Sequence, residues 1–399
     1  MLMIDFDELC SENDLIEKKS TNNEIVQLQK RLQEQACKIK ELQEALSDVE
    51  NMRQLTKKLI LDADDNHSKI NNINSVSSAI KANEDGGYAG SYAHFSIHHE
   101  MLSDFVRTNA YKQAIYENAD QIKDKVVLDL GCGTGILSMF CAQAGAKEVI
   151  AVDMSDIIHH TMDIIRENGF QDKIKLIKGR LEDIKELKDK KFDIIVSEWM
   201  GYFLLYEGML DSVIAARDKY LSPGGLILPN YCSISIFAIS DEERYLKTID
   251  YWKNVYGFKM SCMKEPVLTE ASIEVVPKNK VVSELCEILN LELTQCKIDD
   301  FASFKADFEL QVNQDGPITA IGGCFDTIFT LQNSITLPTN PLMDPTHWKQ
   351  TIFYLEEKIL KNKGDTLKGS IHVYRPPKDA RSLLIKLDVE NQSRIYDMA

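Results

Sequence analysis

Residues 126–135 read Val-Val-Leu-Asp-Leu-Gly-Cys-Gly-Thr-Gly, and this stretch constrains the fold more than any other part of the chain. The apolar residues before Gly131 are typical of a buried parallel strand. The alternating glycines permit a sharp turn and let a ligand approach the backbone closely. Residues 136–144 contain no Gly or Pro and predict a helix, whose first backbone amides are free to face a polar ligand. The stretch therefore predicts a strand, a ligand-binding loop and a helix.

The residues around this loop favour one class of ligand. A second strand is expected at residues 148–152, followed by Asp153, at the spacing of roughly 20 residues from the glycines where an acid reaches ribose hydroxyls. The glycines form G-x-G-x-G, not the G-x-G-x-x-G that beds a pyrophosphate. The pattern favours S-adenosylmethionine, which has no phosphate, and Asp129 is expected to meet its amine. A plain tight turn is the competing interpretation, and Asp129, Asp153 and the strand-helix-strand context weigh against it.

Composition excludes several classes of function. The chain has 399 residues, enough for two or three domains, and its 62 acidic against 46 basic residues give a net charge of -16. Such a charge repels nucleic acid and attracts cationic polypeptides. No apolar run approaches the ~18 residues of a membrane span, and no signal-peptide pattern is present. Nine scattered cysteines without a C-x-x-C pair predict reduced thiols in the cytosol or nucleus and no metal site.

The N-terminal part carries a long helical pattern. Apolar residues from Ile25 to Leu59 recur at three- and four-residue steps, which is typical of a helix with one apolar stripe. Such a helix either lies against the body of the protein or self-associates as a coiled coil, and the pattern leaves both open. The expected segments are a flexible N-terminus at 1–20, the heptad-like helix at 21–61 and a linker at 62–87.

The rest of the chain predicts an α/β domain followed by a β domain. Residues 88–228 are expected to form a Rossmann-like, doubly wound α/β domain that binds S-adenosylmethionine. Residues 229–399 show short alternating runs that predict an antiparallel β-barrel or sandwich, interrupted by an aromatic-rich helical arm at 244–263. The first domain has a helical pattern at 96–118 and strand patterns at 125–130, 148–152, 173–177 and 192–197. The β runs lie at 233–239, 304–312, 320–329, 350–355 and 367–374.

A second informative stretch is Ser-Glu-Trp-Met-Gly-Tyr-Phe-Leu-Leu-Tyr-Glu at residues 197–207, directly after an apolar strand. Glu198 and Glu207 flank a loop that contains Gly201, at the end of the sheet where a substrate would meet the cofactor. Two carboxylates that converge there would hold a cation. The alternative is that one acid is exposed and the other caps a helix.

Five separated motifs, in order, make the chain resemble the protein arginine N-methyltransferases over residues 86–399. They are Tyr-Ala-Gly-Ser-Tyr at 88–92, Ile-His-His-Glu-Met-Leu at 97–102, the glycine loop, the double-glutamate stretch and Thr-His-Trp at 346–348. Residues 257–264, Asp153 and the helical segment look most like the branch of protein arginine N-methyltransferase 3. That branch usually carries an N-terminal zinc finger. Only Cys10 lies before the helix, so the finger is expected to be absent.

The resemblance implies a role for each matching residue. Glu198 and Glu207 resemble the pair that binds the substrate guanidinium, and His347 with Asp104 resembles the pair that accepts a proton. Met101 and Met209 match the methionines that shape the pocket in enzymes that make asymmetric dimethylarginine. The implied cofactor-binding residues are Tyr92, His98, Met101, Arg107, Asp129, Gly131, Gly133, Gly135, Asp153, Met154, Leu181 and Glu182. The implied substrate-binding residues are Tyr88, Met209 and Trp348.

One departure from the family concerns Ala89 and Gly90. They replace an aromatic-acidic pair, so a ring that would cover the adenine is missing, at a cost of ~1 kcal/mol in cofactor binding. The resemblance implies methylation of arginines in Gly/Arg-rich or ribosomal-type proteins to mono- and asymmetric dimethylarginine. It also implies a homodimer, and the N-terminal helix is expected to be available to a partner. Two alternatives remain: a binding scaffold on a degenerate methyltransferase fold, which Ala89 and Gly90 favour, and a small-molecule methyltransferase, which the paired acids disfavour.

Overall fold

The computed structural model describes residues 94–376 and 379–398. The predicted N-terminus at 1–20, the helix at 21–61, the linker at 62–87 and the residues from Tyr88 to Tyr92 lie outside these ranges. None of the helices that the structure describes is both long enough and apolar enough to cross a bilayer.

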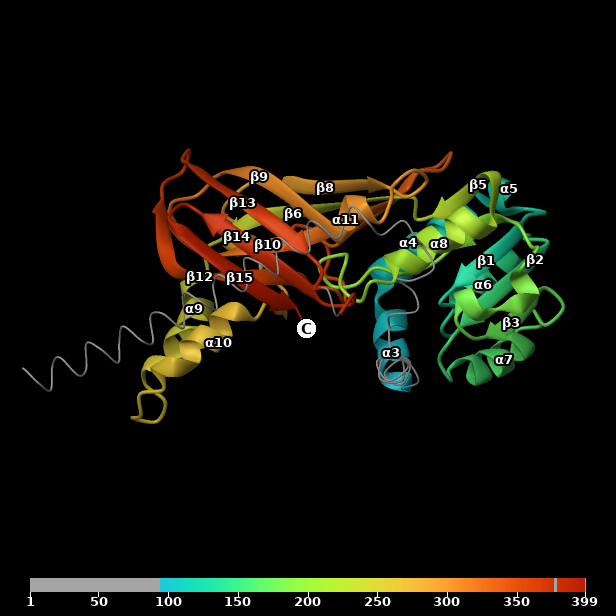
Figure 1. The fold of residues 1–399 in the computed structure, drawn as a ribbon, viewed down its shortest axis with the longest axis horizontal. Coiled ribbons are helices and arrows are strands. Elements are labelled where there is room, and N and C mark those ends of the chain that lie inside the picture. Colours follow the sequence, from blue (N-terminus) through green and yellow to red (C-terminus); the bar gives the residue numbers. More distant parts are fainter. Residues whose placement is uncertain (1–93, 377–378, 399) are drawn as a thin grey trace, which may run out of the picture. The chain divides into compact units, whose positions relative to one another are not determined.

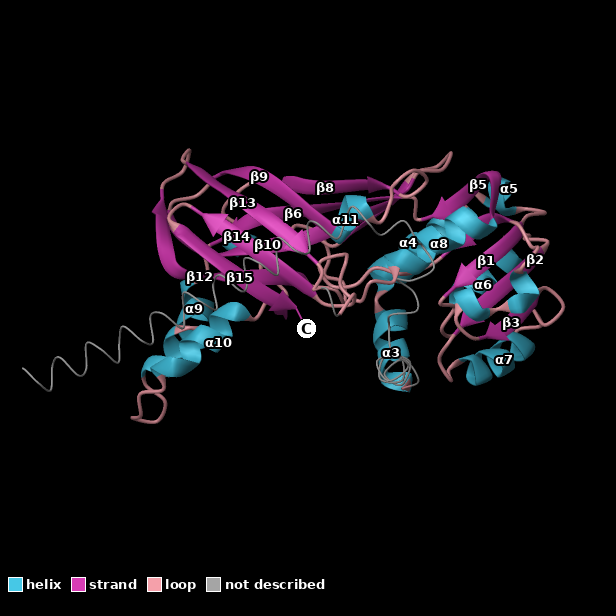
Figure 2. Cartoon of the chain, in the orientation of Figure 1, coloured by secondary structure: helices cyan, strands magenta, loops and turns pink. Residues whose placement is uncertain are grey.

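The first half of the described chain is built on a parallel sheet of strand order β3-β2-β1-β4-β5 (Figure 1). Its three central strands β2, β1 and β4 are short apolar runs buried on both faces, which helices cover (Figure 2). The order reverses between β1 and β4, and ligands of such sheets bind at the carboxyl ends of the strands beside this reversal. The strands are β1 (Val126–Leu130), β2 (Glu148–Asp153), β3 (Ile174–Lys178), β4 (Phe192–Val196) and β5 (Leu221–Leu228).

The predicted strands of this sheet are confirmed to within one residue at each end. The predicted helix after the glycines is confirmed as α6 (Ile136–Gln143). The remaining elements are the helices α5 (Ala119–Ile122), α7 (Ile158–Glu167) and α8 (Leu210–Tyr220), with short 3-10 turns η1 (Leu181–Asp183) and η2 (Lys185–Leu187).

The helical pattern at 96–118 is confirmed, and the structure divides it into two helices. They are α3 (Phe95–Ser103) and α4 (Phe105–Tyr116), separated at Asp104. Asp104 has an extended backbone, with φ of -73° and ψ of 93°, and its side chain accepts a 3.0 Å hydrogen bond from the amide of Arg107. This is an N-cap, so Asp104 starts a new helix where the apolar periodicity alone predicts continuity.

The second half consists of two antiparallel sheets, as predicted. One has the order β7-β12-β10-β6-β8, with β11 paired to β10, and the other has the order β15-β14-β13-β9. The sheets contact each other through β8 with β9 and through β12 with β15. Their strands are β6 (Tyr231–Ile239), β7 (Ser272–Glu274), β8 (Cys286–Glu292), β9 (Ser303–Gln311), β10 (Gly316–Phe329), β11 (Ile335–Pro338), β12 (Gln350–Lys361), β13 (Thr366–Tyr374), β14 (Leu383–Val389) and β15 (Gln392–Met398).

A helical arm leaves these sheets after β6 and returns before β7. It contains α9 (Glu242–Thr248), η3 (Asp250–Lys253), η4 (Ser261–Met263) and α10 (Lys264–Thr269). The sequence pattern predicts helical structure over most of this arm, but the chain turns at Gly257, where φ is +90° and the backbones of Val255 and Phe258 pair. Elsewhere in this half lie η5 (Lys278–Lys280) and α11 (Asp299–Ala302).

One hydrophobic core runs through both halves. It includes β1 and β4 of the parallel sheet and residues of β6, β10 and β12 of the antiparallel sheets. The double-glutamate stretch contributes Trp199, Phe203 and Leu204, which are almost completely buried in this core. The ring of Phe203 lies 5.5 Å from that of Phe353 in β12 and packs against Gly323 of β10. This stretch is therefore a structural joint between the halves as well as the carrier of two carboxylates.

Candidate active site at the ends of the parallel strands

The glycine loop follows β1 and turns through three left-handed residues. Gly131, Gly133 and Gly135 have φ values of +75°, +51° and +80°. The amide of Gly133 donates a 2.8 Å hydrogen bond to Asp153 Oδ2, so the acid at the end of β2 lies against the loop. His98 of α3 also lies beside Gly133, because a Cβ placed there would be 3.5 Å from its ring. The structure therefore brings together the loop and two of the side chains predicted to line a cofactor.

Asp129 lies at the start of the glycine loop with its carboxylate fully buried, and its Oδ2 accepts a 2.6 Å hydrogen bond from Ser138 Oγ. Its Oδ1 is buried without a hydrogen-bond partner among the described residues. The predicted contact of Asp129 with the amine of the cofactor stays a prediction. Burial raises the pKa of Asp129 to about 7, and the nearby charge of Asp153 adds to the effect although the Ser138 hydrogen bond opposes it.

The other predicted cofactor residues surround the same loop or follow the neighbouring strands. A Cβ on Gly131 would be 2.6 Å from Met209 Cε, so this methionine covers the first glycine. Glu182 is exposed in η1 and accepts a 3.3 Å hydrogen bond from Ser212, whereas Leu181 is packed into the core. Met154 directly follows Asp153 and is half-buried. The ligand contacts of these residues stay predictions.

The loop fits S-adenosylmethionine in its chemistry. It offers glycine backbone without side chains at Gly131 and Gly133, the N-terminus of α6 and a neighbouring carboxylate on Asp153. These groups suit a ligand that carries an amino-acid end and a ribose but no phosphate.

The double-glutamate stretch folds into a tight hairpin after β4. The amide of Gly201 donates a 3.0 Å hydrogen bond to the carbonyl of Leu204, and a Cβ on Gly201 would be 1.9 Å from the carbonyl oxygen of Tyr206. Only glycine fits there. The two sides of the hairpin therefore lie against each other, with Glu198 on the first side and Glu207 at the end of the second.

Glu198 is held by a guanidinium from α4. Its Oε2 accepts hydrogen bonds from Arg107 Nη2 at 2.9 Å and from Arg107 Nε at 3.1 Å. Arg107 Nη1 donates a 2.8 Å hydrogen bond to the carbonyl of Met101. Both charged side chains are about nine-tenths buried, which strengthens the attraction between them. The predicted contact of Arg107 with a cofactor carboxylate stays a prediction, since the structure shows Arg107 paired with Glu198.

Asp104 and His347 meet across 243 residues of sequence, as predicted. Asp104 Oδ2 lies 2.7 Å from His347 Nδ1 and accepts a 2.9 Å hydrogen bond from the His347 amide. Burial opposes the charge of this carboxylate, but the hydrogen bonds from His347 and Arg107 outweigh it and lower the pKa of Asp104. The N-cap of α4 therefore also fixes the orientation of the histidine.

Comparison with known proteins identifies the family. A family model described as "Methyltransferase domain" matches residues 122–283, and one described as "Arginine methyltransferase oligomerization subdomain" matches residues 230–394. Protein arginine N-methyltransferase 1 of Dictyostelium discoideum is 46% identical over 324 residues, which cover 81% of this chain and 93% of that protein. The Chlamydomonas reinhardtii protein of the same name is 43% identical, over 76% of this chain and 88% of its own.

The chain belongs to the protein arginine N-methyltransferase family. The reaction is the transfer of a methyl group from S-adenosylmethionine to guanidino nitrogens of arginine in protein substrates. These relatives carry the name protein arginine N-methyltransferase 1, so the predicted likeness to the branch of protein arginine N-methyltransferase 3 is not confirmed.

Solved structures of this family have the same fold as this chain. A Trypanosoma brucei PRMT1 enzyme-prozyme heterotetrameric complex with AdoHcy contains a chain that matches with a TM-score of 0.73 and 38% identity, over 77% of this chain and 98% of its own. Arabidopsis thaliana protein arginine methyltransferase 10 matches with a TM-score of 0.70 and 27% identity, over 78% of this chain and all of its own.

Trp348 of the Thr-His-Trp motif packs against the hairpin. Its side chain is 3% exposed, and its Nε1 donates a 2.8 Å hydrogen bond to the carbonyl of Met200. The centre of its ring lies 4.0 Å from that of His347. Trp348 therefore supports both the hairpin and His347, and its predicted contact with a substrate stays a prediction.

Tyr111 is a site residue that sequence reasoning missed. It lies in α4, is buried, and its hydroxyl donates a 2.9 Å hydrogen bond to the carbonyl of Ser197, just before Glu198. Burial raises the pKa of Tyr111 well above its usual value, and the charge of Glu198 adds to the effect. No local pattern marks this tyrosine, because its partner lies 86 residues further along the chain.

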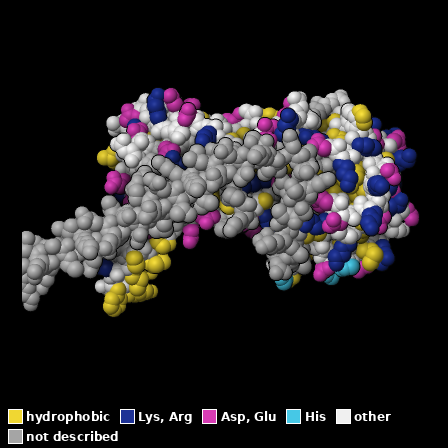
Figure 3. Space-filling view, in the orientation of Figure 1, with side chains coloured by type: hydrophobic (Ala, Val, Ile, Leu, Met, Phe, Trp, Pro, Cys, Tyr) yellow, Lys and Arg dark blue, Asp and Glu magenta, His cyan; other side chains and the backbone are white. Residues whose placement is uncertain are grey.

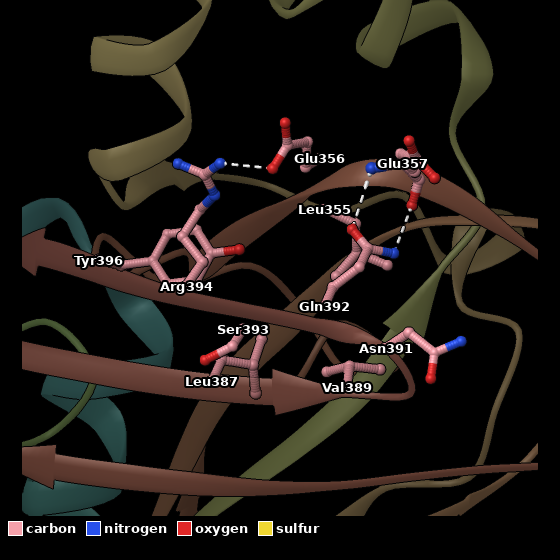
Figure 4. Close-up of a pocket in the computed structure, with 10 residues that line it drawn as sticks. All are labelled: Leu355, Glu356, Glu357, Leu387, Val389, Asn391, Gln392, Ser393, Arg394 and Tyr396. Carbon is pink, nitrogen blue, oxygen red and sulfur yellow. Dashed lines mark hydrogen bonds and ion pairs between the residues drawn. The ribbon is translucent and has the colours of Figure 1, made fainter. Parts of the chain in front are cut away.

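A cavity of about 420 Å³ between β12 and β15 shares no lining residue with this site (Figure 4). Its rim carries Arg394, which pairs with Glu356 at 2.7 Å and with Glu265 at 2.8 Å. Gln392 bonds to the backbone of Glu357 through both its oxygen and its nitrogen. Arg394 and Gln392 thus have hydrogen-bond partners within the protein. We interpret the cavity as a packing gap at the seam where the two antiparallel sheets meet.

Proposed function

We propose that Glu198 and Glu207 bind the substrate guanidinium and that the methyltransferase makes asymmetric dimethylarginine. The observation that carries this proposal is the pairing of Glu198 with Arg107, in which the carboxylate already accepts two N–H groups of a guanidinium. Arg107 uses only Oε2 of this carboxylate. Oε1 accepts one 3.2 Å hydrogen bond from the amide of Met200, and a carboxylate oxygen has a second lone pair for a substrate.

The two carboxylates solve a chemical difficulty. A guanidinium has a pKa above 12 and delocalised lone pairs, so it is a weak nucleophile at neutral pH. Carboxylates that bind part of the guanidinium concentrate its positive charge there and leave the free nitrogen more nucleophilic. S-adenosylmethionine supplies an electrophilic methyl group when it is bound. The glutamates orient the nitrogen and favour the charge distribution of the transition state.

The proton of the methylated nitrogen needs an acceptor, and we assign this role to His347. Its Nδ1 lies 2.7 Å from Asp104 Oδ2, which fixes the orientation of the ring. The two methionines support the assignment of the product. Met209 covers Gly131, and Met101 Sδ lies 4.0 Å from Arg107 Nη2, so flexible thioethers border both the glycine loop and the Arg107–Glu198 pair.

The product assignment is tested with an Arg/Gly-rich peptide that contains a single arginine. The methyltransferase is incubated with S-adenosylmethionine and this peptide, and a matched peptide with lysine in place of arginine is the control. We expect mono- and then dimethylated arginine, with fragmentation that releases dimethylamine, and no product on the lysine peptide. Release of monomethylamine alone from the dimethylated product would mean one methyl group on each terminal nitrogen and would contradict the asymmetric assignment.

The substrate class and the assembly are proposed on the basis of charge and exposed apolar surface. A net charge of -16 favours the binding of basic, arginine-rich proteins as substrates. The scattered cysteines favour a location in the cytosol or nucleus. Apolar side chains gather at the tip of the arm (Figure 3), among them Tyr256, which is 94% exposed, and Phe258, which is 70% exposed. Exposed aromatics of this kind mark an interface, and we propose that the arm joins two copies into a homodimer.

The assembly is tested by removing residues 244–262. We expect the shortened protein to sediment as a monomer with weak activity, whereas the parent sediments as a dimer. A parent protein that stays monomeric at high concentration would contradict the homodimer.

A further inference from the structure

The β13–β14 connection contacts the double-glutamate hairpin from the side of the antiparallel sheets. The amide of Glu207 donates a 2.8 Å hydrogen bond to the carbonyl of Arg381. A Cβ on the next residue, Gly208, would be 2.7 Å from the carbonyl oxygen of Ala380. Arg375, at the start of the connection, donates hydrogen bonds to both oxygens of Asp211, at 2.9 and 2.7 Å. The connection therefore touches the hairpin at Glu207 and the chain that follows it.

Glu207 needs such support because its backbone is strained. Its φ is +74°, in the left-handed region, where a residue with a Cβ is held at a cost of roughly 1–2 kcal/mol. A strained backbone of this kind persists only where its surroundings determine it. The next residue, Gly208, is also left-handed, with φ of +68°, and the Ala380 carbonyl leaves no room for a side chain there. The direction in which the Glu207 side chain leaves the hairpin thus depends on the β13–β14 connection.

Arg375 is the firmest point of this connection. Its amide donates a 3.2 Å hydrogen bond to the carbonyl of Ala302, and its guanidinium lies over the ring of Phe301 at 5.2 Å. Its side chain is about nine-tenths buried. Asp211 lies in the first turn of α8, where the helix dipole favours an acid. Because Asp211 is four residues from Glu207, the ion pair fixes the exit of the hairpin against the antiparallel sheets.

We propose that Arg375 is a positioning residue for arginine methylation. Paired with Asp211, it seats the β13–β14 connection against the hairpin and so fixes the Glu207 carboxylate relative to Glu198. The inference rests on the proposed role of the two glutamates as guanidinium ligands. It adds that the second glutamate is aligned by a residue of the other half of the molecule, far from the site in sequence.

The test uses the full chain with Asp211→Asn, Arg375→Met and the double variant. We measure kcat and KM for the Arg/Gly-rich peptide, the affinity for S-adenosylhomocysteine and the melting temperature. Loosening the second carboxylate should lower kcat by about 10-fold or more, since small misplacements of catalytic groups reduce rates steeply. Cofactor affinity should stay within about twofold of the parent value, because neither residue lies at the glycine loop. The double variant should lose no more kcat than the worse single variant, because both changes break one ion pair.

Arg394→Met is the matched control. Arg394 of β15 also forms two short ion pairs, one with Glu356 of β12 (Figure 4) and one with Glu265 of α10, and neither partner belongs to the hairpin. It should keep the kcat of the parent at a similar loss of melting temperature. Arg375→Lys, which keeps the charge, should recover part of the lost kcat.

Two results would overturn the proposal. One is a kcat of the Asp211→Asn variant close to that of the parent, in a protein that folds and whose Glu207→Gln variant is inactive. The other is an equal loss of kcat in the Arg394→Met variant, which would mean general loosening of the sheets. If Glu207→Gln itself reacts at the parent rate, the proposed function fails instead, and the alignment of Glu207 has no catalytic meaning.

Discussion

The two glutamates of the hairpin receive support from different halves of the molecule. Glu198 is fixed through its side chain, which accepts hydrogen bonds from Arg107 within the same half of the molecule. Glu207 is fixed through its backbone, by the carbonyl of Arg381 in the other half. The contact with Arg107 sets the electrostatic surroundings of the Glu198 carboxylate. The contact with the Arg381 carbonyl sets the direction in which the Glu207 side chain leaves the backbone. A pair of identical residues can thus depend on two different kinds of support.

The largest expected effect comes from removing the charge of either glutamate. Glu198→Gln and Glu207→Gln keep the shape, so the loss should appear in kcat, by roughly 10²-fold or more as for other preorganised electrostatic groups. Affinity for S-adenosylhomocysteine should change little. In addition, Glu198→Gln leaves Arg107 partly unpaired and should lower the free energy of unfolding. A peptide turnover close to the parent rate in either variant would rule out the guanidinium clamp.

A smaller effect is expected at Arg107. Arg107→Met leaves the nine-tenths buried Glu198 without its cation, which should lower the free energy of unfolding by about 2 kcal/mol. Urea unfolding measures this loss, and Arg107→Lys, which keeps a charge but not the fork, is the control and should lie in between. If Arg107→Met unfolds at the same urea concentration as the parent, the pair does not support Glu198 as described.

The smallest expected effect concerns Asp104, which supports His347 and starts α4. Asp104→Ala should lower the free energy of unfolding by about 1 kcal/mol through the lost N-cap alone, whereas Asp104→Asn keeps a capping oxygen. The carboxylate also contributes through its lowered pKa. Since the pKa of Asp104 in the folded protein lies below its ordinary value of 3.8, this contribution is complete above that pH and is lost as the pH falls through the folded value.

Unfolding measured from pH 6 down to pH 3 tests this linkage. The gap in stability between the parent and the Asp104→Asn variant should be constant above pH ~5 and should shrink in the acid range. A gap that widens on acidification would have the wrong sign for a carboxylate stabilised by His347 and Arg107.

The features that could be predicted from the sequence are those with a local pattern. Apolar runs beside glycines predict the strands of the parallel sheet and the glycine loop, because burial on two faces and a left-handed turn each restrict the residue types nearby. The break at Asp104 has a local cause too, but an acid within an apolar periodicity fits both a cap and an exposed helical position. The pairing of Asp104 with His347 was predicted only through the family resemblance.

Other features have no local pattern at all. The hydrogen bond between Asp129 and Ser138 depends on how α6 packs on β1, and the glycine-rich motif does not indicate it. The partners of Trp348 and Arg375 lie more than a hundred residues away, and their contacts exist only once both halves have folded. These residues look like ordinary members of a loop and a strand end until the tertiary structure is known.

The continuous core has a consequence for modularity. Because Phe203 of the hairpin packs on Phe353 and Gly323 of the antiparallel sheets within one core that also holds β1 and β4, the chain offers no clean place to be cut near residue 229. A fragment that ends there would carry the glycine loop and both glutamates, yet it would expose the apolar face that β10 and β12 cover. A chimera that exchanges only the antiparallel sheets between relatives would lose the same apolar contacts. The hairpin has to be exchanged together with the sheets against which it packs. The unit that can be transplanted is therefore the whole described body, and the boundary between its two folds is not a boundary between two independent parts.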